Sequence, residues 1–473
     1  MRVLLIAVPL VDRIGQRLVP IAMDRYKTSP PLGIYLLAAI AREAGHDVQV
    51  LDLIAHGSLD LQRAIDAAGR CDVVGVSANS LNWPSARMVV DAVKEAFPRL
   101  PAVMGGIHPT SFPDHVLRHS KADYLICGEG DHALPSLLAA LAGRIPLRDV
   151  PGLAWIEDGF LHCNPNPALG IDEISALPDP AYDLLPGDCY ESLSVESSRG
   201  CRFSCTFCST RFRGSWRALP ADLFVGRLER LQPQVDRTIY KAFSFIDDLF
   251  TFDAQRVIDI ARRIDERAMD VWATLDARVT DIIKPGVAHA IEPMVSQMLV
   301  GAECGYNEGL KAIRKGASVE IIERAAAVLH DIGLAPRTVF SFIIGFPFET
   351  ADDCRRTIEF ATGLLQRYNV RIYLQWFNAI PGSELWDALV ADGDLDIAMY
   401  DEFGFLTNER IFRTGIRLPL DDIRELSATV RSLNMLLFLT RPAADVLQFA
   451  QPDWLNAPTL DLPSKGILLP KGP

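Results

Sequence analysis

The stretch Ser198-Arg199-Gly200-Cys201-Arg202-Phe203-Ser204-Cys205-Thr206-Phe207-Cys208 carries three cysteines in a C-x3-C-x2-C spacing. Thiolates are soft ligands that suit iron–sulfur clusters or zinc, and a loop this short can hold three of them around one face of a cluster. Three ligands leave one iron with an open position, where a small molecule can bind. Cys201, Cys205 and Cys208 are therefore the candidate catalytic and metal-binding residues.

Two simpler explanations are less favourable. A zinc site needs a fourth ligand, and the nearest histidines before and after the cysteines are His162 and His289. Three unrelated core cysteines would rarely fall so close together. The chain has nine cysteines. In a reducing compartment, clustered cysteines such as these three indicate a metal or redox site rather than disulfides, and the other six are scattered.

The region around these cysteines alternates strand and helix patterns. Strands are predicted at residues 193–197, 239–246, 271–274, 297–301, 338–344 and 371–376, with helices between them, such as 254–267 and 321–332. Six β/α units predict a partial (β/α)6 barrel of the TIM type over residues 191–395, with its chemistry at the carboxyl ends of the strands. We expect residues 396–473 to be a mainly helical C-terminal region that includes a helix at 420–439.

An alternating pattern also fills residues 1–145. Strands are predicted at 3–8, 48–53, 73–77, 102–104 and 124–127, and helices at 32–44, 59–68, 85–97, 112–119 and 133–141. This order predicts a flavodoxin-like (Rossmann-like) parallel sheet that binds a ligand in the loops 9–31, 78–84, 105–110 and 128–131. Residues 146–190 are rich in proline and indicate an ordered linker, with a hairpin around Asp158-Gly159.

The bulk composition limits the function classes. A chain of 473 residues that is 49% hydrophobic and 23% charged is typical of a globular protein of two or three domains. The net charge of −13 argues against general binding of nucleic acids or anionic membranes. Because no apolar run reaches about 18 residues and no signal peptide is evident, we expect a cytoplasmic protein without a membrane span.

The cysteine loop resembles the signature of the radical SAM superfamily, in which an aromatic residue, here Phe207, precedes the last cysteine. The resemblance implies a [4Fe–4S] cluster whose open iron binds S-adenosylmethionine, with the adenine beside Phe207. Reductive cleavage then gives a 5′-deoxyadenosyl radical. An electron donor such as flavodoxin or ferredoxin is implied as a partner.

Three further motifs resemble the same family and extend the S-adenosylmethionine site. Asp247 and Asp248 end the second strand, where the family holds the methionine amino group, whereas Asp253 fits a helix N-cap. Gly301-Ala302-Glu303-Cys304-Gly305 resembles the Gly-x-Glu-Ser-Gly stretch of the subgroup with an N-terminal cobalamin domain, which places Glu303 near the methionine or ribose. Ile344-Gly345 belongs to the motif of the fifth strand beside the adenine.

Three residues are tentative substrate contacts: Gln375, Asn378 and Cys304. Cys304 replaces the usual serine or threonine, and it is either inert packing, which we prefer, or a thiol near the radical. Glu349 is read either as part of the motif of the fifth strand or as a helix cap.

The same subgroup carries a cobalamin domain ahead of the barrel, and four loop motifs match it, among them Gly105-Gly106-Ile107-His108 and Gly128-Glu129-Gly130. The resemblance implies cobalamin contacts from Ser77, Asn79, Ser80, Gly105, Gly106, Ile107, His108, Gly128, Glu129 and Gly130. The Asp-x-His-x-x-Gly motif that ligates cobalt elsewhere is missing. We therefore expect cobalamin without a protein histidine on the metal.

The resemblance as a whole is to class B radical SAM methyltransferases. It implies methylation of an unactivated carbon of a small natural-product or lipid-like molecule, using methylcobalamin and a 5′-deoxyadenosyl radical. The alternative uses the same cofactors without methyl transfer, in oxidative cyclisation, ring contraction or a redox rearrangement. A cobalamin-binding regulator or electron carrier would leave the open-iron cysteine set unexplained.

Overall fold

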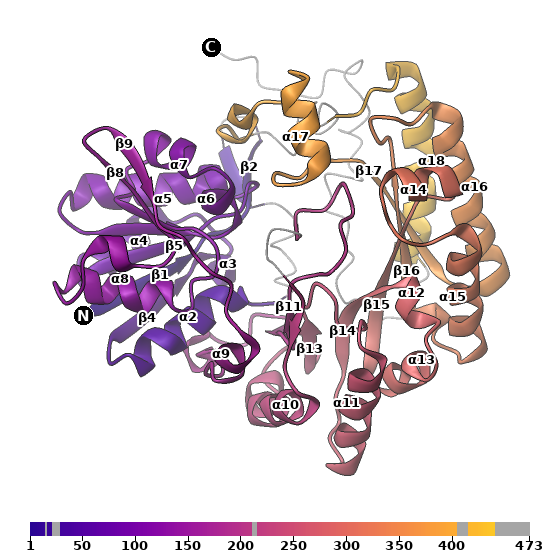
Figure 1. Ribbon diagram of the computed structural model, residues 1–473, viewed down its shortest axis with the longest axis horizontal. Coiled ribbons are helices and arrows are strands. Elements are labelled where there is room, and N and C mark those ends of the chain that lie inside the picture. The colour runs from indigo at the N-terminus through magenta and orange to yellow at the C-terminus, as the bar shows by residue number, and fades with distance from the viewer. Residues whose placement is uncertain (15–16, 21–28, 211–214, 404–414, 440–473) are drawn as a thin grey trace. The chain divides into compact units, whose positions relative to one another are not determined.

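The computed structural model describes residues 1–14, 17–20, 29–210, 215–403 and 415–439. The chain forms two compact units, Met1–Tyr190 with a segment that begins at Ile397, and Glu191–Asp396 with the helix α18 (Leu420–Leu439). Each unit contains one large sheet with helices packed on it (Figure 1). Among the described residues, no helix is both long and apolar enough to span a membrane.

The first unit contains a parallel sheet in the order β4-β1-β5-β6-β7, which two antiparallel strands extend. The strands are β1 (Arg2–Ala7), β4 (Asp47–Asp52), β5 (Val73–Ser77), β6 (Ala102–Gly105), β7 (Tyr124–Ile126), β8 (Leu153–Glu157) and β9 (Phe160–Cys163). The order reverses between β1 and β5, as in flavodoxin-like folds, so the predicted fold class is confirmed. A reversal of this kind places a ligand at the carboxyl ends of the neighbouring strands.

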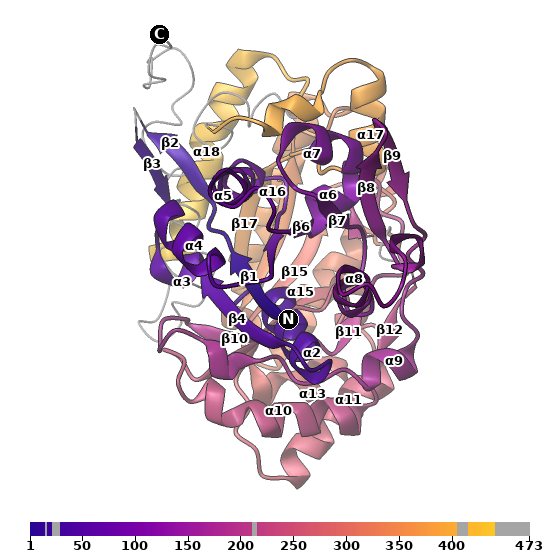
Figure 2. The ribbon, with the colours of Figure 1, turned by 90° about the vertical axis from the view of Figure 1, so that its left-hand side faces the viewer.

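Helices cover both faces of this sheet (Figure 2). Residues of α2 (Leu32–Glu43) and α8 (Ala133–Leu141) share one apolar core with Val3, Leu5 and Val103, which lie on one face of the strands. Because the residues between them along β1 are buried as well, the other face is also covered. The remaining helices are α3 (Leu53–His56), α4 (Leu61–Ala68), α5 (Trp83–Ala96), α6 (Ile107–Ser111), α7 (Pro113–His119) and α9 (Ile171–Ser175).

Two hairpins refine the prediction for this unit. Asp158 (φ 52°) and Gly159 (φ 81°) make the turn between β8 and β9, so the expected hairpin is present and continues the sheet. A second hairpin pairs β2 (Val11–Ile14) with β3 (Arg17–Pro20), inside the segment expected to be a loop. Residues 21–28 of that loop lie outside the described part of the chain.

The second unit has six parallel strands that pair in chain order, which confirms the partial barrel. They are β10 (Ser192–Val195), β13 (Ala242–Phe245), β14 (Ala273–Arg278), β15 (Val295–Glu303), β16 (Thr338–Ile344) and β17 (Arg371–Trp376). The helices are α10 (Ala221–Val235), α11 (Ala254–Glu266), α12 (Val279–Ile282), α13 (Val287–Ile291), α14 (Asn307–Ala312), α15 (Val319–Asp331), α16 (Ala351–Tyr368) and α17 (Glu384–Ala391).

Four strands of this sheet differ in length from their prediction: β10, β13, β14 and β15. The strand predicted from residue 239 begins at Ala242, because Lys241 adopts a left-handed backbone (φ 50°) that interrupts it. The strand predicted to end at residue 274 continues to Arg278, so two more charged side chains, Asp276 and Arg278, lie on the sheet.

The six-stranded sheet has an outer face toward the helices and an opposite face, which we call the inner face. Phe245 packs against Phe224 of α10, with ring centroids 5.2 Å apart, so the neighbouring Ser244 lies on the inner face. The hydroxyl of Thr274 donates to the hydroxyl of Ser244 at 3.3 Å. Since side chains alternate along a strand, Asp276 and Arg278 lie on the inner face too.

The predicted C-terminal helix is present as α18, which packs on β17, the last strand of the sheet, and on α16. The side-chain amide of Asn434 accepts a hydrogen bond from the Leu374 amide at 2.9 Å and donates one to the Leu374 carbonyl at 2.7 Å. An edge strand is a site of unwanted pairing, so this contact protects the sheet.

Candidate functional site

The loop with the three cysteines begins directly after β10 and the short strand β11 (Ser198–Arg199), which pairs with β12 (Arg217–Ala218). Gly200 adopts a positive φ of 81°, which lets the chain turn sharply into Cys201. All three cysteines are free thiols, with Cys205 buried and Cys201 and Cys208 half-buried. The loop thus presents three uncommitted thiols at the carboxyl end of the first barrel strand.

The loop is anchored on the segment after α14 and on β14. The Thr206 amide donates to the Ile313 carbonyl at 3.1 Å. The Arg278 guanidinium lies 3.6 Å over the ring of Phe203, and its Nη1 is 3.7 Å from Cys205 Sγ. A cation here offsets the negative charge that three thiolates bring to the loop. Sequence reasoning missed Arg278, although its place at the end of a barrel strand was a usable signal.

The donor set fits an iron–sulfur cluster. Burial raises the pKa of the Cys201 thiol, the Phe203 amide and Arg278 lower it, and the nearby thiols of Cys208 and Cys205 raise it further. Within the described residues, no group of three His, Cys, Asp or Glu side chains is arranged for a single metal ion. Three free thiols beside one guanidinium suit a cluster with one open iron.

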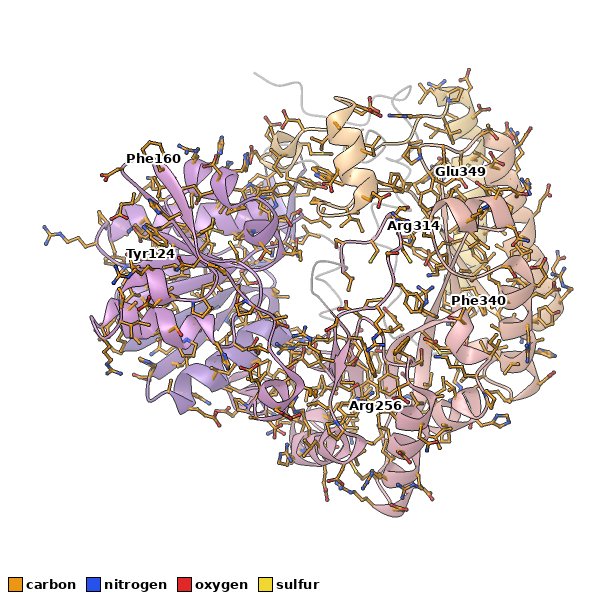
Figure 3. The ribbon with its side chains drawn as sticks, viewed as in Figure 1. Tyr124, Phe160, Arg256, Arg314, Phe340 and Glu349 are labelled. Carbon is orange, nitrogen blue, oxygen red and sulfur yellow. The ribbon has the colours of Figure 1, made fainter. Side chains whose placement is uncertain are left out.

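Asp247 stabilises the two residues that lead into this loop, Ser197 and Ser198. Its carboxylate accepts hydrogen bonds from the Ser197 amide (3.1 Å) and from the hydroxyls of Ser197 (2.8 Å) and Ser198 (2.5 Å). Burial raises the pKa of Asp247 to about 6, against the lowering effects of Ser198, of Arg256 (Figure 3) and of Ser197. These contacts favour a bracing role for Asp247 over a contact with S-adenosylmethionine, whereas Asp248 is half-buried and accepts from the Gly200 amide at 3.2 Å.

Replacing Asp247 by alanine is expected to impair the cluster loop. Two serine hydroxyls and one amide would lose a buried charged acceptor, which costs about 1–3 kcal/mol for each group left unsatisfied. We expect a lower free energy of unfolding and reduced iron content after reconstitution. Asp248→Asn is the matched variant and should keep its iron. Wild-type iron content and stability in Asp247→Ala would contradict the bracing role.

Glu303 sits at a strained point at the end of β15. Its backbone has a φ of 69°, the pairing with β16 shifts there, and Glu303 Oε1 lies 2.6 Å from Lys315 Nζ in a buried ion pair. Gly301 has no room for a side chain, since a Cβ would lie 2.5 Å from Glu303 Oε1 and 2.7 Å from Lys315 Nζ. The adjacent Cys304 is completely buried and burial raises its pKa, which favours packing over substrate contact.

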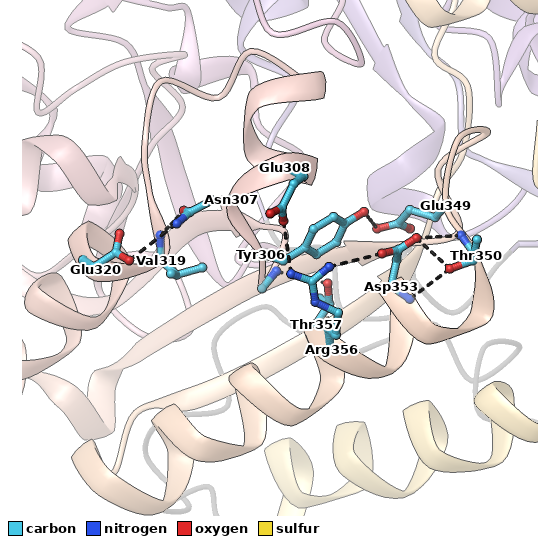
Figure 4. A network of polar contacts seen from close by, with 11 residues as sticks. Tyr306, Asn307, Glu308, Val319, Glu320, Glu349, Thr350, Asp353, Arg356 and Thr357 are labelled. Carbon is cyan, nitrogen blue, oxygen red and sulfur yellow. Dashed lines mark hydrogen bonds and ion pairs between the residues drawn. The ribbon is translucent and has the colours of Figure 1, made fainter.

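The loop after β16 is held by Glu349 (Figure 4). The amides of Gly345 (2.6 Å) and Phe346 (3.0 Å) donate to Glu349 Oε2, and the Tyr306 hydroxyl donates to Oε1 at 2.9 Å. Burial raises the pKa of Glu349, and these donors oppose the rise. Thr350 is the N-cap of α16, so Glu349 shapes the loop rather than capping the helix.

The structure also places the remaining candidate residues of the barrel. Phe207 lies with its ring 5.9 Å from that of Phe346, so the cysteine loop and the loop after β16 meet. Ile344 has a fully buried side chain, which leaves only its backbone for a ligand. Gln375 lies on β17 and donates to the Ser341 hydroxyl at 3.3 Å, and Asn378 Oδ1 is buried without a partner among the described residues.

The candidate cobalamin loops gather at the carboxyl ends of β5, β6 and β7. Ser77 and Gly105 are register partners, and the Thr110 hydroxyl links the loops by donating to the Gly106 carbonyl (2.7 Å) and accepting from the Gly128 amide (2.9 Å). Gly106 has a φ of 101°, and a Cβ there would lie 2.4 Å from the Ala78 carbonyl. The loops themselves therefore require this glycine, and their position beside the strand-order reversal fits a nucleotide-like ligand.

The side chains in these loops are partly occupied by their own turns. Asn79 Oδ1 accepts from the amides of Leu81 and Asn82, each at 2.9 Å, and Glu129 Oε2 accepts from the Leu169 amide at 2.8 Å. The half-buried Ser80, Ile107 and Gly130 complete the predicted set.

His108 is an interior residue of this unit. It is 0% exposed, stacks on Trp83 at 5.0 Å, and has Nδ1 3.1 Å from the Ser80 hydroxyl. Burial lowers the pKa of His108 to about 3, so the imidazole is neutral. This environment favours a packing role for His108, and cobalamin without a protein histidine on cobalt stays a prediction.

Comparison with protein families gives two matches. Residues 19–138 match the B12 binding domain, and residues 195–361 match the radical SAM superfamily.

Three relatives align over 61% to 80% of this chain. An uncharacterized methyltransferase, PH0819 of Pyrococcus horikoshii, is 31% identical over 382 residues, which are 77% of this chain and 79% of the relative. A hopanoid C-3 methylase of Methylococcus capsulatus is 30% identical over 61% of this chain and 56% of its own length. An anaerobic magnesium-protoporphyrin IX monomethyl ester cyclase of Rubrivivax gelatinosus is 26% identical over 80% of this chain and 69% of the cyclase.

The fold is also similar to a solved structure. The cobalamin-dependent S-adenosylmethionine radical enzyme OxsB, with aqua-cobalamin and S-adenosylmethionine bound, aligns with a TM-score of 0.66 at 20% identity. The alignment covers 83% of this chain and 55% of OxsB, so the chain spans about half of that protein. At this identity the likeness concerns the fold.

Proposed function

Because this chain belongs to the cobalamin-dependent radical SAM enzymes, we propose that it methylates an unactivated carbon of a small molecule. The observation that carries the proposal is the combination of a B12 binding domain and a three-thiol loop in one chain, which is 31% identical to a protein named as a methyltransferase. When bound, the cluster and S-adenosylmethionine supply a 5′-deoxyadenosyl radical, and cobalamin supplies the methyl group.

The residues of the chain bind and orient these groups. Cys201, Cys205 and Cys208 would hold three irons and leave the fourth for the amino and carboxylate groups of S-adenosylmethionine. Asp248 and Glu303 would accept hydrogen bonds from its ammonium and ribose, and Phe207 with Gly345 would flank the adenine. Arg278 and Asp247 hold the loop in place from two sides.

The loops at the carboxyl ends of β5, β6 and β7 would hold cobalamin through backbone groups and small side chains. The half-buried Ser77, Gly105 and Gly106 would lie under the corrin and its nucleotide tail. The single-electron reductant would come from a flavodoxin or ferredoxin, and the polar groups of Gln375 and Asn378 would face the substrate.

The second candidate function uses the same cofactors without methyl transfer. It is favoured by the cyclase relative, which aligns over 80% of this chain. The hopanoid methylase and the uncharacterized methyltransferase have higher identity, so methyl transfer is the better supported reading.

Product analysis of the reconstituted enzyme separates these functions. With S-adenosylmethionine, reductant and candidate substrates, we expect both 5′-deoxyadenosine and S-adenosylhomocysteine, because a radical and a methyl group are each drawn from a separate molecule of S-adenosylmethionine. Formation of 5′-deoxyadenosine alone would support the cyclase-like alternative. Formation of neither, with cluster and cobalamin loaded, would refute both.

A further inference from the structure

Asp276 is a carboxylate without a partner on the inner face of the barrel sheet. It lies in the middle of β14, and its side chain is exposed on the same face as Thr274 and Arg278. No described residue gives it a hydrogen bond or an ion pair. The surrounding protein, and then the carboxylate of Asp248, raise its pKa to about 6. An exposed carboxylate that contacts no described residue holds no turn, helix cap or ion pair, so a structural role does not explain its place on this strand.

Gln297 provides a second, independent sign of a ligand. It lies on the next strand, β15, as the register partner of Thr274, so its side chain is on the inner face as well. It is only 2% exposed, and neither atom of its amide has a hydrogen-bond partner among the described residues. Buried amides are almost always paired in folded proteins, so an unpaired one beside Asp276 indicates a missing partner.

Apolar side chains accompany these polar groups. Ile246, two residues after Ser244, is 45% exposed, and the half-buried Leu299 is the register partner of Asp276. A molecule on this face would therefore meet hydrocarbon as well as a carboxylate. Asp276 and Asp248, which are close enough to influence each other, disfavour an anionic group. The cation on this face, Arg278, is already in contact with the Phe203 ring and with Cys205 Sγ.

We propose that Asp276 recognises the substrate, and that the substrate presents to it a cationic nitrogen, an ammonium group attached to an apolar body. The inference rests on the proposed function, because it places the substrate on the inner face beside the radical-forming site. The ammonium would donate charge-assisted hydrogen bonds to Asp276, and Gln297 would accept or donate a further one. The apolar body would cover Ile246 and Leu299.

Binding of simple probes to the enzyme loaded with cluster and cobalamin tests this proposal. Cyclohexylmethylammonium, cyclohexylmethanol and cyclohexanecarboxylate share one apolar body and differ in the polar group. In calorimetric titrations we expect wild type to bind the ammonium about tenfold more tightly than the alcohol, the value of one charge-assisted hydrogen bond. The carboxylate should bind most weakly.

Two variants test whether the preference for the ammonium depends on Asp276. Asp276→Asn should remove the preference for the ammonium, whereas Asp265→Asn, the same change at an exposed position on α11, should keep it. The raised pKa of Asp276 means that its ionisation disfavours the fold at neutral pH, so Asp276→Asn should resist urea at least as well as wild type. If Asp276→Asn is as stable in urea as wild type, a loss of ammonium binding in this variant cannot be attributed to unfolding.

Three results would overturn the proposal. The first is equal binding of all three probes by wild type, and the second is a preference for the ammonium that is retained in Asp276→Asn. The third is a parallel loss of S-adenosylmethionine affinity in Asp276→Asn, which would make Asp276 a contact of that cofactor. The titrations need no turnover, so they are independent of the proposed methyl transfer. Absence of S-adenosylhomocysteine in the product analysis would refute that function and leave the ammonium preference standing.

Discussion

Simultaneous replacement of Cys201, Cys205 and Cys208 by alanine is expected to abolish the iron–sulfur absorbance of the anaerobically reconstituted protein. These thiols are all free, and they occupy one loop at the carboxyl end of β10. Without them no thiolate set remains for the cluster, because the other cysteines are dispersed over the chain. Formation of 5′-deoxyadenosine should fall to the background level, which makes this the largest effect expected for any substitution.

The control removes a thiol elsewhere. Cys163 lies on the exposed strand β9, and Cys163→Ala should retain the absorbance and the iron content of wild type. Metal analysis of the same samples separates iron from zinc. Zinc bound in stoichiometric amount to wild type, with no iron incorporated on reconstitution, would refute the cluster.

Much of the fold could be predicted because the lengths of the helices and the alternation of strands and helices all indicate the same fold class. The helix expected at 133–141 has those bounds as α8, and that expected at 420–439 has those of α18. Short apolar runs between such helices leave few arrangements besides parallel sheets. The rule of right-handed crossovers limits the topologies further, whereas the strand order of the first unit is seen only in the structure.

The polar interior was harder to predict. The sequence predicts that the strand β14 ends at Thr274, whereas in the structure it continues to Arg278. Thr274, Asp276 and Arg278 alternate with the buried Leu275 and Ala277, which is the period of a strand with one polar face. Such a face is unusual in a packed barrel, and it is the face on which we propose that the substrate binds.

The partners of the acidic residues could not be read from the sequence either. Asp247 and Asp248 are adjacent, yet Asp247 is surrounded by Ser197 and Ser198 while Asp248 contacts the Gly200 amide. Which carboxylate faces a ligand depends on contacts across about fifty positions of the chain. Only the three-dimensional structure distinguishes a carboxylate that stabilises the cysteine loop from one that is available to a ligand.

Lys315→Met is expected to lower the free energy of unfolding by about 3–5 kcal/mol, since it leaves the Glu303 carboxylate buried without its cation. The two side chains form an ion pair of 2.6 Å in which both are more than nine-tenths buried. Glu303→Gln should destabilise for the converse reason, by leaving the Lys315 ammonium unpaired. Urea unfolding at neutral pH measures both losses.

The double variant Glu303→Gln with Lys315→Met separates the ion pair from the cofactor contact. It removes both charges, so most of the lost stability should return, because the pair couples strongly. If Glu303 also accepts a hydrogen bond from S-adenosylmethionine, this refolded variant should still bind it about tenfold or more weakly, the cost of losing a bond to a charged group. Equilibrium dialysis with the cluster loaded measures that affinity. Wild-type affinity in the stable double variant would restrict Glu303 to the ion pair and remove it from the S-adenosylmethionine site.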